Sequence, residues 1–226
     1  VGKIGRRPSH GLKRPGEILV AQVVHHGPKD RISEVGCLTA LTLDGRILWQ
    51  SGAPDPWKDG LTNDVAVQIH DLDGDGRGEV VYARDMELVI ADGLTGRPRR
   101  KVPTPLVPRG DDRPTSRFER ILGDSLYFCD LRGTGAARDV ILKDRYWHVW
   151  AYNERLELLW DRQLNTGHYP FAYDVDGDGR DELAIGYSLL DDDGTLLWSH
   201  DSDLQDHADG VAIVRFEEGA APRWLC

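Results

Sequence analysis

The fold of this chain is limited above all by an acidic loop, DxDGDGxxE, that leads directly into an apolar segment. The loop occurs twice and aligns without a gap, as HDLDGDGRGEVVYA (70–83) and YDVDGDGRDELAIG (173–186), and a degenerate copy, CDLRGTGAARDVILK (129–143), lies between them. A second recurring element is a tight turn before a strand that ends in tryptophan: LDGRILW (43–49), NERLELLW (153–160) and DDGTLLW (192–198). Self-similarity at a period of about 40 residues is typical of repeated supersecondary units.

Each unit predicts four short strands, because runs of Val, Ile, Leu, Tyr and Trp are bounded by Gly and Asp, and no segment has a convincing helical period. Four strands in about 40 residues is the pattern of a β-propeller blade. We therefore predict an all-β fold, a β-propeller of four-stranded blades that forms a single domain over residues 1–226. The blades are expected near 16–50, 62–103, 122–163 and 166–201, with a partial fifth at 207–226.

The two ends of the chain also carry a prediction. The fifth unit is truncated, and the chain begins with VGKIG, without an initiator Met or a signal peptide. Closed propellers have about four to eight blades. We expect this chain, with four to five blades, to be a processed or trimmed part of a larger ring.

One segment interrupts the repeat. TPLVPRGDDRPTSRFER (104–120), rich in Pro and Arg, is predicted to be an insertion between the second and third blades. Two interpretations remain open for it, a solvated surface loop and a basic flap over an anionic ligand.

The charge of the chain narrows the range of its partners, and its cysteines bear on disulfide formation. The formal net charge is −10, which argues against a nucleic-acid partner or an anionic membrane surface, and no apolar stretch is long enough to span a membrane. Cys37 and Cys129 lie in apolar runs, and Cys226 is the third cysteine. One disulfide is conceivable, but buried core thiols are the better interpretation.

The two intact acidic loops predict calcium sites. Alternate residues of such a loop direct carboxylates to one centre, a glycine-rich turn allows the tight path, and hard oxygen ligands select Ca²⁺ over zinc or copper. The expected ligands are Asp71, Asp73, Asp75 and Glu79 in the first loop and Asp174, Asp176, Asp178 and Glu182 in the second. Their expected role is structural, holding together the first two strands of a blade.

The sequence excludes an EF-hand at the two intact loops. An EF-hand needs a bidentate Glu at position 12 and flanking helices, whereas position 12 is Tyr82 in one loop and Ile185 in the other, both within predicted strands. The degenerate loop has Arg132 and Thr134 where carboxylates are expected. We predict that the Arg132 guanidinium takes the place of the cation there, paired with Asp130 or Asp139.

Strand alternation predicts a second group of residues on the opposite rim. If the acidic loops join the first and second strands of each blade, then the turns from second to third strand and the links between blades lie at the other edge. This rim is expected to collect Arg84, Asp85, Lys143, Asp144, Arg145, Tyr146, His148, Asn165, His168, Tyr169, His207 and Asp209.

Such a set suits β-elimination on a uronic acid. The proton at C5 is poorly acidic until the adjacent carboxylate is neutralised, and Arg145 is the candidate for this role through a bidentate contact. A His or Tyr base then removes the proton and a second His or Tyr protonates the leaving oxygen. His148 and His168 are the expected pair, with Tyr146 as an alternative acid, and substrate contacts are expected from Lys143, Tyr169, Asn165, His207 and Arg84. Glycoside hydrolysis by two carboxylates is the weaker alternative, with Asp85, Asp144 and Asp209.

Three resemblances bear on this prediction. The loops DLDGDGRGE and DVDGDGRDE resemble those of FG-GAP and integrin-type propellers. The run 165–216 resembles the propeller of family 11 rhamnogalacturonan lyases, where a His-Gly-Asp segment opens the next blade and His207-Ala208-Asp209 stands here. His148 and His168, 20 residues apart, are similar to the histidine pair of propeller ulvan lyases.

The resemblances imply a secreted or periplasmic polysaccharide lyase, or a large part of one, acting on an acidic polysaccharide such as rhamnogalacturonan or ulvan, with Ca²⁺ as cofactor. The alternative is a non-catalytic, calcium-stabilised FG-GAP-type propeller that binds glycan or protein.

Overall fold

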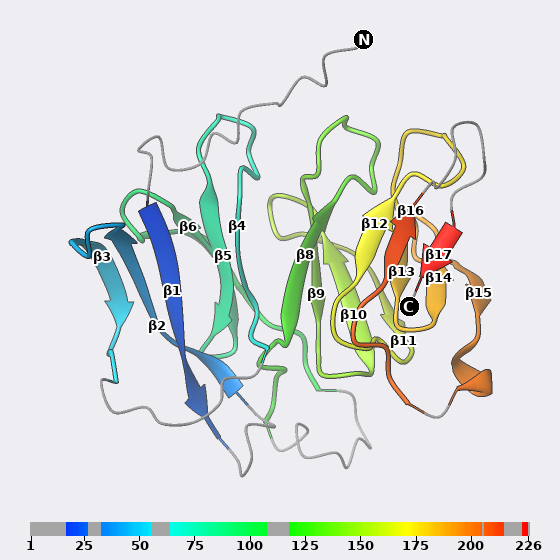
Figure 1. The fold of residues 1–226 in the computed structure, drawn as a ribbon, viewed down its shortest axis with the longest axis horizontal. Coiled ribbons are helices and arrows are strands. Elements are labelled where there is room, and N and C mark those ends of the chain that lie inside the picture. Colours follow the sequence, from blue (N-terminus) through cyan, green and yellow to red (C-terminus); the bar gives the residue numbers. More distant parts are fainter. Residues whose placement is uncertain are drawn as a thin grey trace.

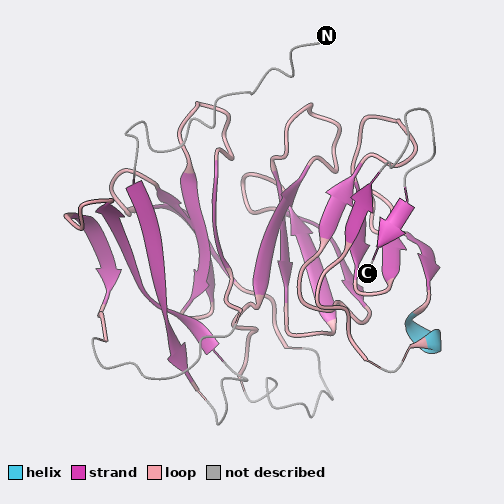
Figure 2. Ribbon diagram, in the orientation of Figure 1, coloured by secondary structure: helices cyan, strands magenta, loops and turns pink. Residues whose placement is uncertain are grey.

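The computed structural model of the chain describes residues 17–26, 33–55, 64–107, 118–204, 206–214 and 223–225. In this part of the chain the fold is all-β, apart from a single 3-10 turn at Asp201–Asp203. Figure 2 shows that nearly all of the regular structure is strand, joined by short loops. No helix among the described residues has the length and apolar character needed to cross a membrane.

The strands form five antiparallel sheets in chain order, which we call blades one to five. Blade one contains β1 (Glu17–His25), β2 (Ser33–Thr42) and β3 (Ile47–Gly52). Blade two contains β4 (Val67–His70), β5 (Glu79–Arg84), β6 (Glu87–Asp92) and β7 (Pro98–Pro103). Blade three contains β8 (Ser125–Cys129), β9 (Asp139–Lys143), β10 (His148–Tyr152) and β11 (Leu158–Gln163). Blade four contains β12 (Phe171–Tyr173), β13 (Glu182–Ile185), β14 (Ser188–Leu190) and β15 (Leu196–Ser199), and blade five contains β16 (Ala212–Val214) and β17 (Arg223–Leu225).

The blades stand side by side, as in a propeller (Figure 1). Consecutive strands are neighbours within each sheet, so the chain moves outward from the first strand of a blade and then crosses to the next blade. Blade one has three strands in the described region, and its β2–β3 turn corresponds to the third hairpin of a complete blade. The predicted all-β, four-stranded antiparallel architecture is confirmed.

The hydrophobic core lies between successive blades. Four clusters of buried residues fill the four spaces from blade one to blade five. Strand β9 contributes to two of them, because Val140 and Leu142 face blade two while Ile141 faces blade four. A strand that is buried on both faces is apolar throughout instead of alternating, which explains the continuous apolar runs after each acidic loop.

Tryptophans on the outer strands join neighbouring blades. The indole N–H of Trp49 in blade one donates a hydrogen bond to the Gly93 carbonyl of blade two at 3.0 Å. The indole of Trp160 in blade three donates in the same way to the Asp192 carbonyl of blade four at 2.7 Å. In blade two the corresponding residue is Arg100, since it pairs with Ile90 just as Trp49 pairs with Ala40 in its own blade.

The packing of the Trp160 ring against Gly194 predicts that one added methyl group will lower the stability of the protein markedly. Gly194 has φ 79°, and a Cβ added there would lie 2.7 Å from the Trp160 ring. Gly194→Ala should lower the melting temperature markedly, because left-handed strain of about 1–2 kcal/mol is joined by overpacking of about 1–3 kcal/mol. Gly45→Ala is the matched control, since Gly45 occupies a comparable hairpin with φ 87° and no atom within 4 Å. Equal melting temperatures for the two variants would contradict a packed joint.

Two sequence predictions can be compared directly with the fold. Cys37 and Cys129 are free and buried, as core thiols should be, and they form no disulfide. The predicted insertion at 104–120 falls mostly outside the described residues, which leave out 108–117.

The two edges of the blades carry different features. The loops β4–β5, β8–β9 and β12–β13 lie along one edge, which we call the loop rim (upper edge in Figure 1). The turns β5–β6, β9–β10 and β13–β14, together with the links between blades, lie along the other edge, which we call the link rim.

Candidate active site and cation sites

The turn between β9 and β10 positions Tyr146 at the link rim. The buried Asp144 carboxylate accepts hydrogen bonds from the backbone N–H groups of Trp147 at 3.0 Å and His148 at 2.7 Å, which fixes the tight turn. Tyr146 has φ 83°, a left-handed conformation that residues other than glycine rarely adopt. Strained residues of this kind persist where the surrounding structure enforces them, and they cluster at functional sites.

His168 lies in the link that leads into blade four, and two side chains hold its ring. Its Nδ1 is 2.6 Å from the Asp64 carboxylate and its Nε2 is 3.2 Å from the Tyr146 hydroxyl. A carboxylate only accepts hydrogen bonds, so Nδ1 carries a proton, and in the neutral imidazole the Nε2 lone pair then faces Tyr146. The side chain is 19% exposed, which leaves His168 accessible from the rim.

Close approach of two links brings blade five to this group. Gly167 has φ 57°, and a Cβ there would lie 2.4 Å from the Ala208 carbonyl oxygen. The same carbonyl accepts the His168 backbone N–H at 2.9 Å. This contact positions His207 beside His168, with ring centroids 5.0 Å apart and with the Tyr146 ring 4.5 Å from His207.

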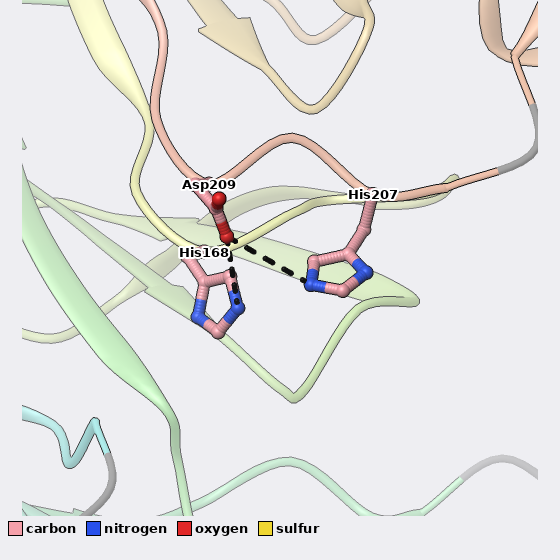
Figure 3. Close-up of side chains that lie close together, drawn as sticks. All are labelled: His168, His207 and Asp209. Atoms are coloured by element: carbon pink, nitrogen blue, oxygen red, sulfur yellow. Dashed lines mark ion pairs between the residues drawn. The ribbon is translucent and has the colours of Figure 1, made fainter.

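Asp209 completes a group of three possible metal ligands (Figure 3). Its Oδ1 is 3.7 Å from His168 Nε2 and 4.0 Å from His207 Nε2, and the ligand atoms of the three residues all lie within 4.8 Å of one another. Two imidazoles and a carboxylate form a donor set that suits a transition metal such as zinc. The same set can instead serve as proton donors and acceptors.

Asp64 is a member of this group that sequence reasoning missed. It joins two residues of blade four, because its Oδ2 contacts His168 and its Oδ1 accepts a hydrogen bond from the Tyr169 hydroxyl at 2.9 Å. Burial, reinforced by this bond, raises the pKa of Tyr169 to about 12, so Tyr169 stays protonated near neutral pH. Its position in the repeat could have identified Asp64. It lies just before the first strand of blade two, as His168 and Asp209 lie just before the first strands of blades four and five.

The structure does not bring every predicted residue into the group. Arg145 stays close, with its guanidinium carbon 5.3 Å from the centroid of the Tyr146 ring. Asn165 is half-buried and accepts the Gly167 backbone N–H at 3.3 Å, so it shapes the link. Arg84 instead donates to the Ser51 carbonyl at 3.2 Å, between blades one and two.

Lys143 and His148 are buried, which removes them from the rim. Lys143 is fully buried and its Nζ lies 2.5 Å from the Asp124 carboxylate. The His148 Nδ1 contacts Asp144 at 3.0 Å, and its Nε2 is buried without a partner in the described region. Both side chains belong to strands β9 and β10, whose faces are covered by neighbouring blades, so neither can touch a polymer at the surface in this arrangement.

The acidic loops form two carboxylate cages on the loop rim. Ligand atoms of Asp71, Asp73 and Glu79 lie within 4.8 Å of one another in blade two, as do those of Asp174, Asp176 and Glu182 in blade four. We call these groups cage two and cage four. Each cage has one glutamate that is 2% exposed and accepts a backbone N–H from its own loop.

The donor chemistry of both cages fits a hard divalent cation. Burial, followed by the like charges of Asp176, Asp191 and Asp174, raises the pKa of Glu182 to about 7. Burial also raises the pKa of Glu79. Carboxylates crowded in this way are stabilised in the ionised form by a cation.

Asp75 and Asp178, the remaining predicted ligands, do not join the cages. Each turns back to accept the backbone N–H two residues later, at 2.8 Å, from Arg77 and Arg180 respectively. Asp75 also forms an ion pair with the Arg77 side chain at 2.8 Å. Asp73 and Asp176 accept the same kind of bond within their loops, so it is the position of the ligand atoms that separates Asp75 and Asp178 from the cages.

In the degenerate loop of blade three a guanidinium lies where the repeat predicts a cation. Arg132 Nε is 2.6 Å from the fully buried Asp139 carboxylate, and the same guanidinium pairs with Glu154. The Asp130 carboxylate is occupied by backbone donors, among them Thr134 N–H at 2.7 Å and Gly135 N–H at 2.5 Å. Of the two partners predicted for Arg132, the structure selects Asp139.

Comparison with known proteins relates this fold to solved propeller structures. No protein-family model matches the sequence, and no curated protein matches it. The exotype rhamnogalacturonan lyase YesX is 21% identical, with a TM-score of 0.63 over 91% of this chain and 41% of its own. Bacillus licheniformis rhamnogalacturonan lyase PL11 is 20% identical, with a TM-score of 0.64 over 96% of this chain and 49% of its own.

The V. cholerae biofilm matrix protein Bap1 is also similar, at 18% identity and a TM-score of 0.56 over 92% of this chain and 34% of its own. The chain therefore spans less than half the length of each of these three proteins. At these identities the likeness is one of fold, and it supports a propeller-like architecture of the kind found in rhamnogalacturonan lyases.

Proposed function

We propose that this chain is the propeller, or part of it, of a secreted polysaccharide lyase that cleaves an acidic, uronate-containing polysaccharide by β-elimination. The observation that carries the proposal is His168, held between Asp64 and Tyr146 on an accessible rim. The fold likeness to two rhamnogalacturonan lyases supports the substrate class.

In the proposed reaction, neutral His168 removes the C5 proton through Nε2. The electron pair of the C5–H bond becomes the C4=C5 double bond, and the bond from C4 to the glycosidic oxygen breaks. The Tyr146 hydroxyl protonates the departing oxygen and then recovers a proton from the His168 imidazolium, 3.2 Å away. The proton balance closes on these two residues, and the Asp64 carboxylate stabilises the imidazolium while it exists.

The substrate carboxylate needs a positive partner before C5 becomes acidic. Arg145 fits this role because it lies against the Tyr146 ring at the same rim. His207 and Tyr169 border the group and are the remaining substrate contacts in this proposal.

We also propose that cages two and four hold Ca²⁺. The supporting observations are the oxygen-only donor set and the nearly complete burial of one glutamate in each cage. The ion would bind three carboxylates, offset most of their negative charge and stabilise the loop between the first two strands of its blade.

The decisive test is a panel of acidic polysaccharides incubated with the full-length protein. Lyase action gives an unsaturated uronate with strong ultraviolet absorbance, which hydrolysis does not give. Absorbance growth with rhamnogalacturonan or ulvan would support the proposal. No product from any uronate polymer with the full-length protein would contradict it.

Asp64→Asn should lower kcat about 10- to 100-fold with a small change in KM, because the amide can donate to Nδ1 and so impose the wrong tautomer on His168. Imidazole nitrogen chemical shifts measured by NMR would report that tautomer change independently of turnover. Tyr169→Phe is the matched control, since it removes the other hydrogen bond of Asp64 and leaves the contact with His168 in place. Loss of the Nδ1–H tautomer of His168 in Tyr169→Phe, or its retention in Asp64→Asn, would contradict the positioning role.

A second candidate function is a non-catalytic propeller that binds glycan or protein. The similarity of Bap1, a biofilm matrix protein, favours this alternative, since one fold can serve unrelated functions. Retention on an immobilised acidic polysaccharide without product formation by the full-length protein would support it.

A further inference from the structure

The outer strands of the blades share one irregularity. Each has a single extra residue, a β-bulge, just before the residue that contacts the next blade. The bulged residue is Leu48 in blade one, Leu159 in blade three and Leu197 in blade four, whereas in blade two it is Arg99. The same structural position therefore carries a charge in blade two alone of these four blades.

The Arg99 side chain reaches cage two. Its Nη1 is 2.9 Å from Glu79 Oε1 and 3.4 Å from Asp73 Oδ2, and its Nη2 pairs with Asp92. The guanidinium thus contacts two of the three cage carboxylates, one of them 2% exposed. A cation attracted to cage two has to share or take these oxygen atoms.

Cage four has no such arginine. The carboxylates of Asp174, Asp176 and Glu182 accept hydrogen bonds from backbone N–H groups of their own loop. Within the described ranges they form no ion pair with a lysine or arginine. The nearby Arg180 points instead to Asp192, at 2.7 Å.

Arg99 also has room to move. Asp73, Glu79 and Arg99 line a cavity of about 270 Å³ between blades two and three. Arg99 is 36% exposed, and the adjacent Arg100 donates a hydrogen bond to the Arg155 carbonyl at 3.4 Å. The guanidinium can therefore withdraw from the cage into this cavity without disturbing the sheet.

We propose that Arg99 is an internal counter-ion that competes with a divalent cation for cage two, so that cages two and four bind calcium with different affinities. The inference rests on the proposed calcium sites. Affinity in oxygen-donor loops depends on the number of ligand charges, and the guanidinium cancels one of the three in cage two. Cage four fills first, and cage two fills as Arg99 is displaced.

Calorimetric titration with Ca²⁺ tests each cage in isolation. In an Asp176→Ala background, which leaves cage two, adding Arg99→Leu should tighten binding about ten-fold. In an Asp73→Ala background, which leaves cage four, Leu197→Arg should weaken it by a similar factor. Arg100→Leu is the matched control, because it removes the neighbouring positive charge from the same strand without touching a cage carboxylate, and it should leave the affinity of cage two unchanged.

The possible results distinguish a failure of the Arg99 competition from a failure of the proposed calcium sites. No heat and no thermal stabilisation with Ca²⁺ in the wild-type chain would overturn the calcium sites, and this inference with them. Calcium binding of equal affinity with and without Arg99, measured in the Asp176→Ala background, would overturn the competition alone. A ten-fold change in Arg100→Leu as well would also overturn it, since a general loss of positive charge would then explain the result.

Discussion

His168→Ala should reduce turnover of an acidic polysaccharide by about a hundred- to ten-thousand-fold in the full-length protein, the range that a general acid or base contributes. The imidazole is the one group in the described site that touches both the Asp64 carboxylate and the Tyr146 hydroxyl, so its loss removes the proposed base and its link to the proposed acid. Initial rates of product absorbance, measured with circular dichroism on the same sample, check activity and fold together.

The control for this experiment is His200→Ala. His200 follows β15 at the link rim, is 62% exposed, pairs with Asp203 at 3.0 Å and takes no part in the His168 contacts. Its replacement should leave turnover within a factor of about two, as for other exposed positions away from a site. Full activity in a folded His168→Ala variant would remove His168 from the mechanism.

Calcium should raise the melting temperature of the wild-type chain by about 5 to 10 °C when it is in 100-fold excess over its dissociation constant. Binding to the native state at that ratio stabilises by about 2.7 kcal/mol, and each kcal/mol shifts the melting temperature of a chain this size by about 2–4 °C. Asp176→Ala, which opens cage four, should lose most of this response, because the proposed order of filling puts the tighter site there. Differential scanning calorimetry with added Ca²⁺ or chelator measures the shift.

Asp178→Ala is the informative comparison for that prediction. Asp178 is in the same loop and was a predicted ligand, yet its carboxylate lies outside the group of ligand atoms that forms cage four. It should keep the calcium response even if the loop becomes somewhat less stable. Melting curves of the wild-type chain that coincide with and without chelator would contradict a stabilising metal.

The repeat in the sequence predicted the fold because each unit encodes its own strands. The apolar runs after Asp71 and Asp174 could be read as central strands, since a strand with both faces covered is apolar throughout. The rim assignment then followed from antiparallel order, and it brought Tyr146, His168 and His207 together correctly.

The rim assignment did not predict which of the rim side chains are buried. Rim position suggested that Lys143 and His148 are accessible, but both belong to the covered strands β9 and β10. Lys143 is compensated by Asp124, a pairing that no local pattern reveals.

Asp64 was missed for a different reason. It lies 104 residues before its partner His168, and only the packing of separate blades brings them together. The contact of Arg99 with cage two could not be predicted for the same reason, because it depends on the face of the sheet to which a β-bulge directs the side chain. Sequence periodicity fixes which edge a residue occupies, whereas contacts across blades require the three-dimensional arrangement.

The separation of the two rims has a further consequence for the electrostatics of the molecule. The strands of blades two and three mostly have five or six residues, which span roughly 17–20 Å, about twice the Debye length of roughly 8 Å at physiological ionic strength. A cation bound in the carboxylate loops should therefore act only weakly, through its charge, on the residues of the link rim. A change of calcium concentration would then alter the stability of the protein without altering the activity of the link-rim residues. Mutations at one rim could likewise accumulate independently of mutations at the other.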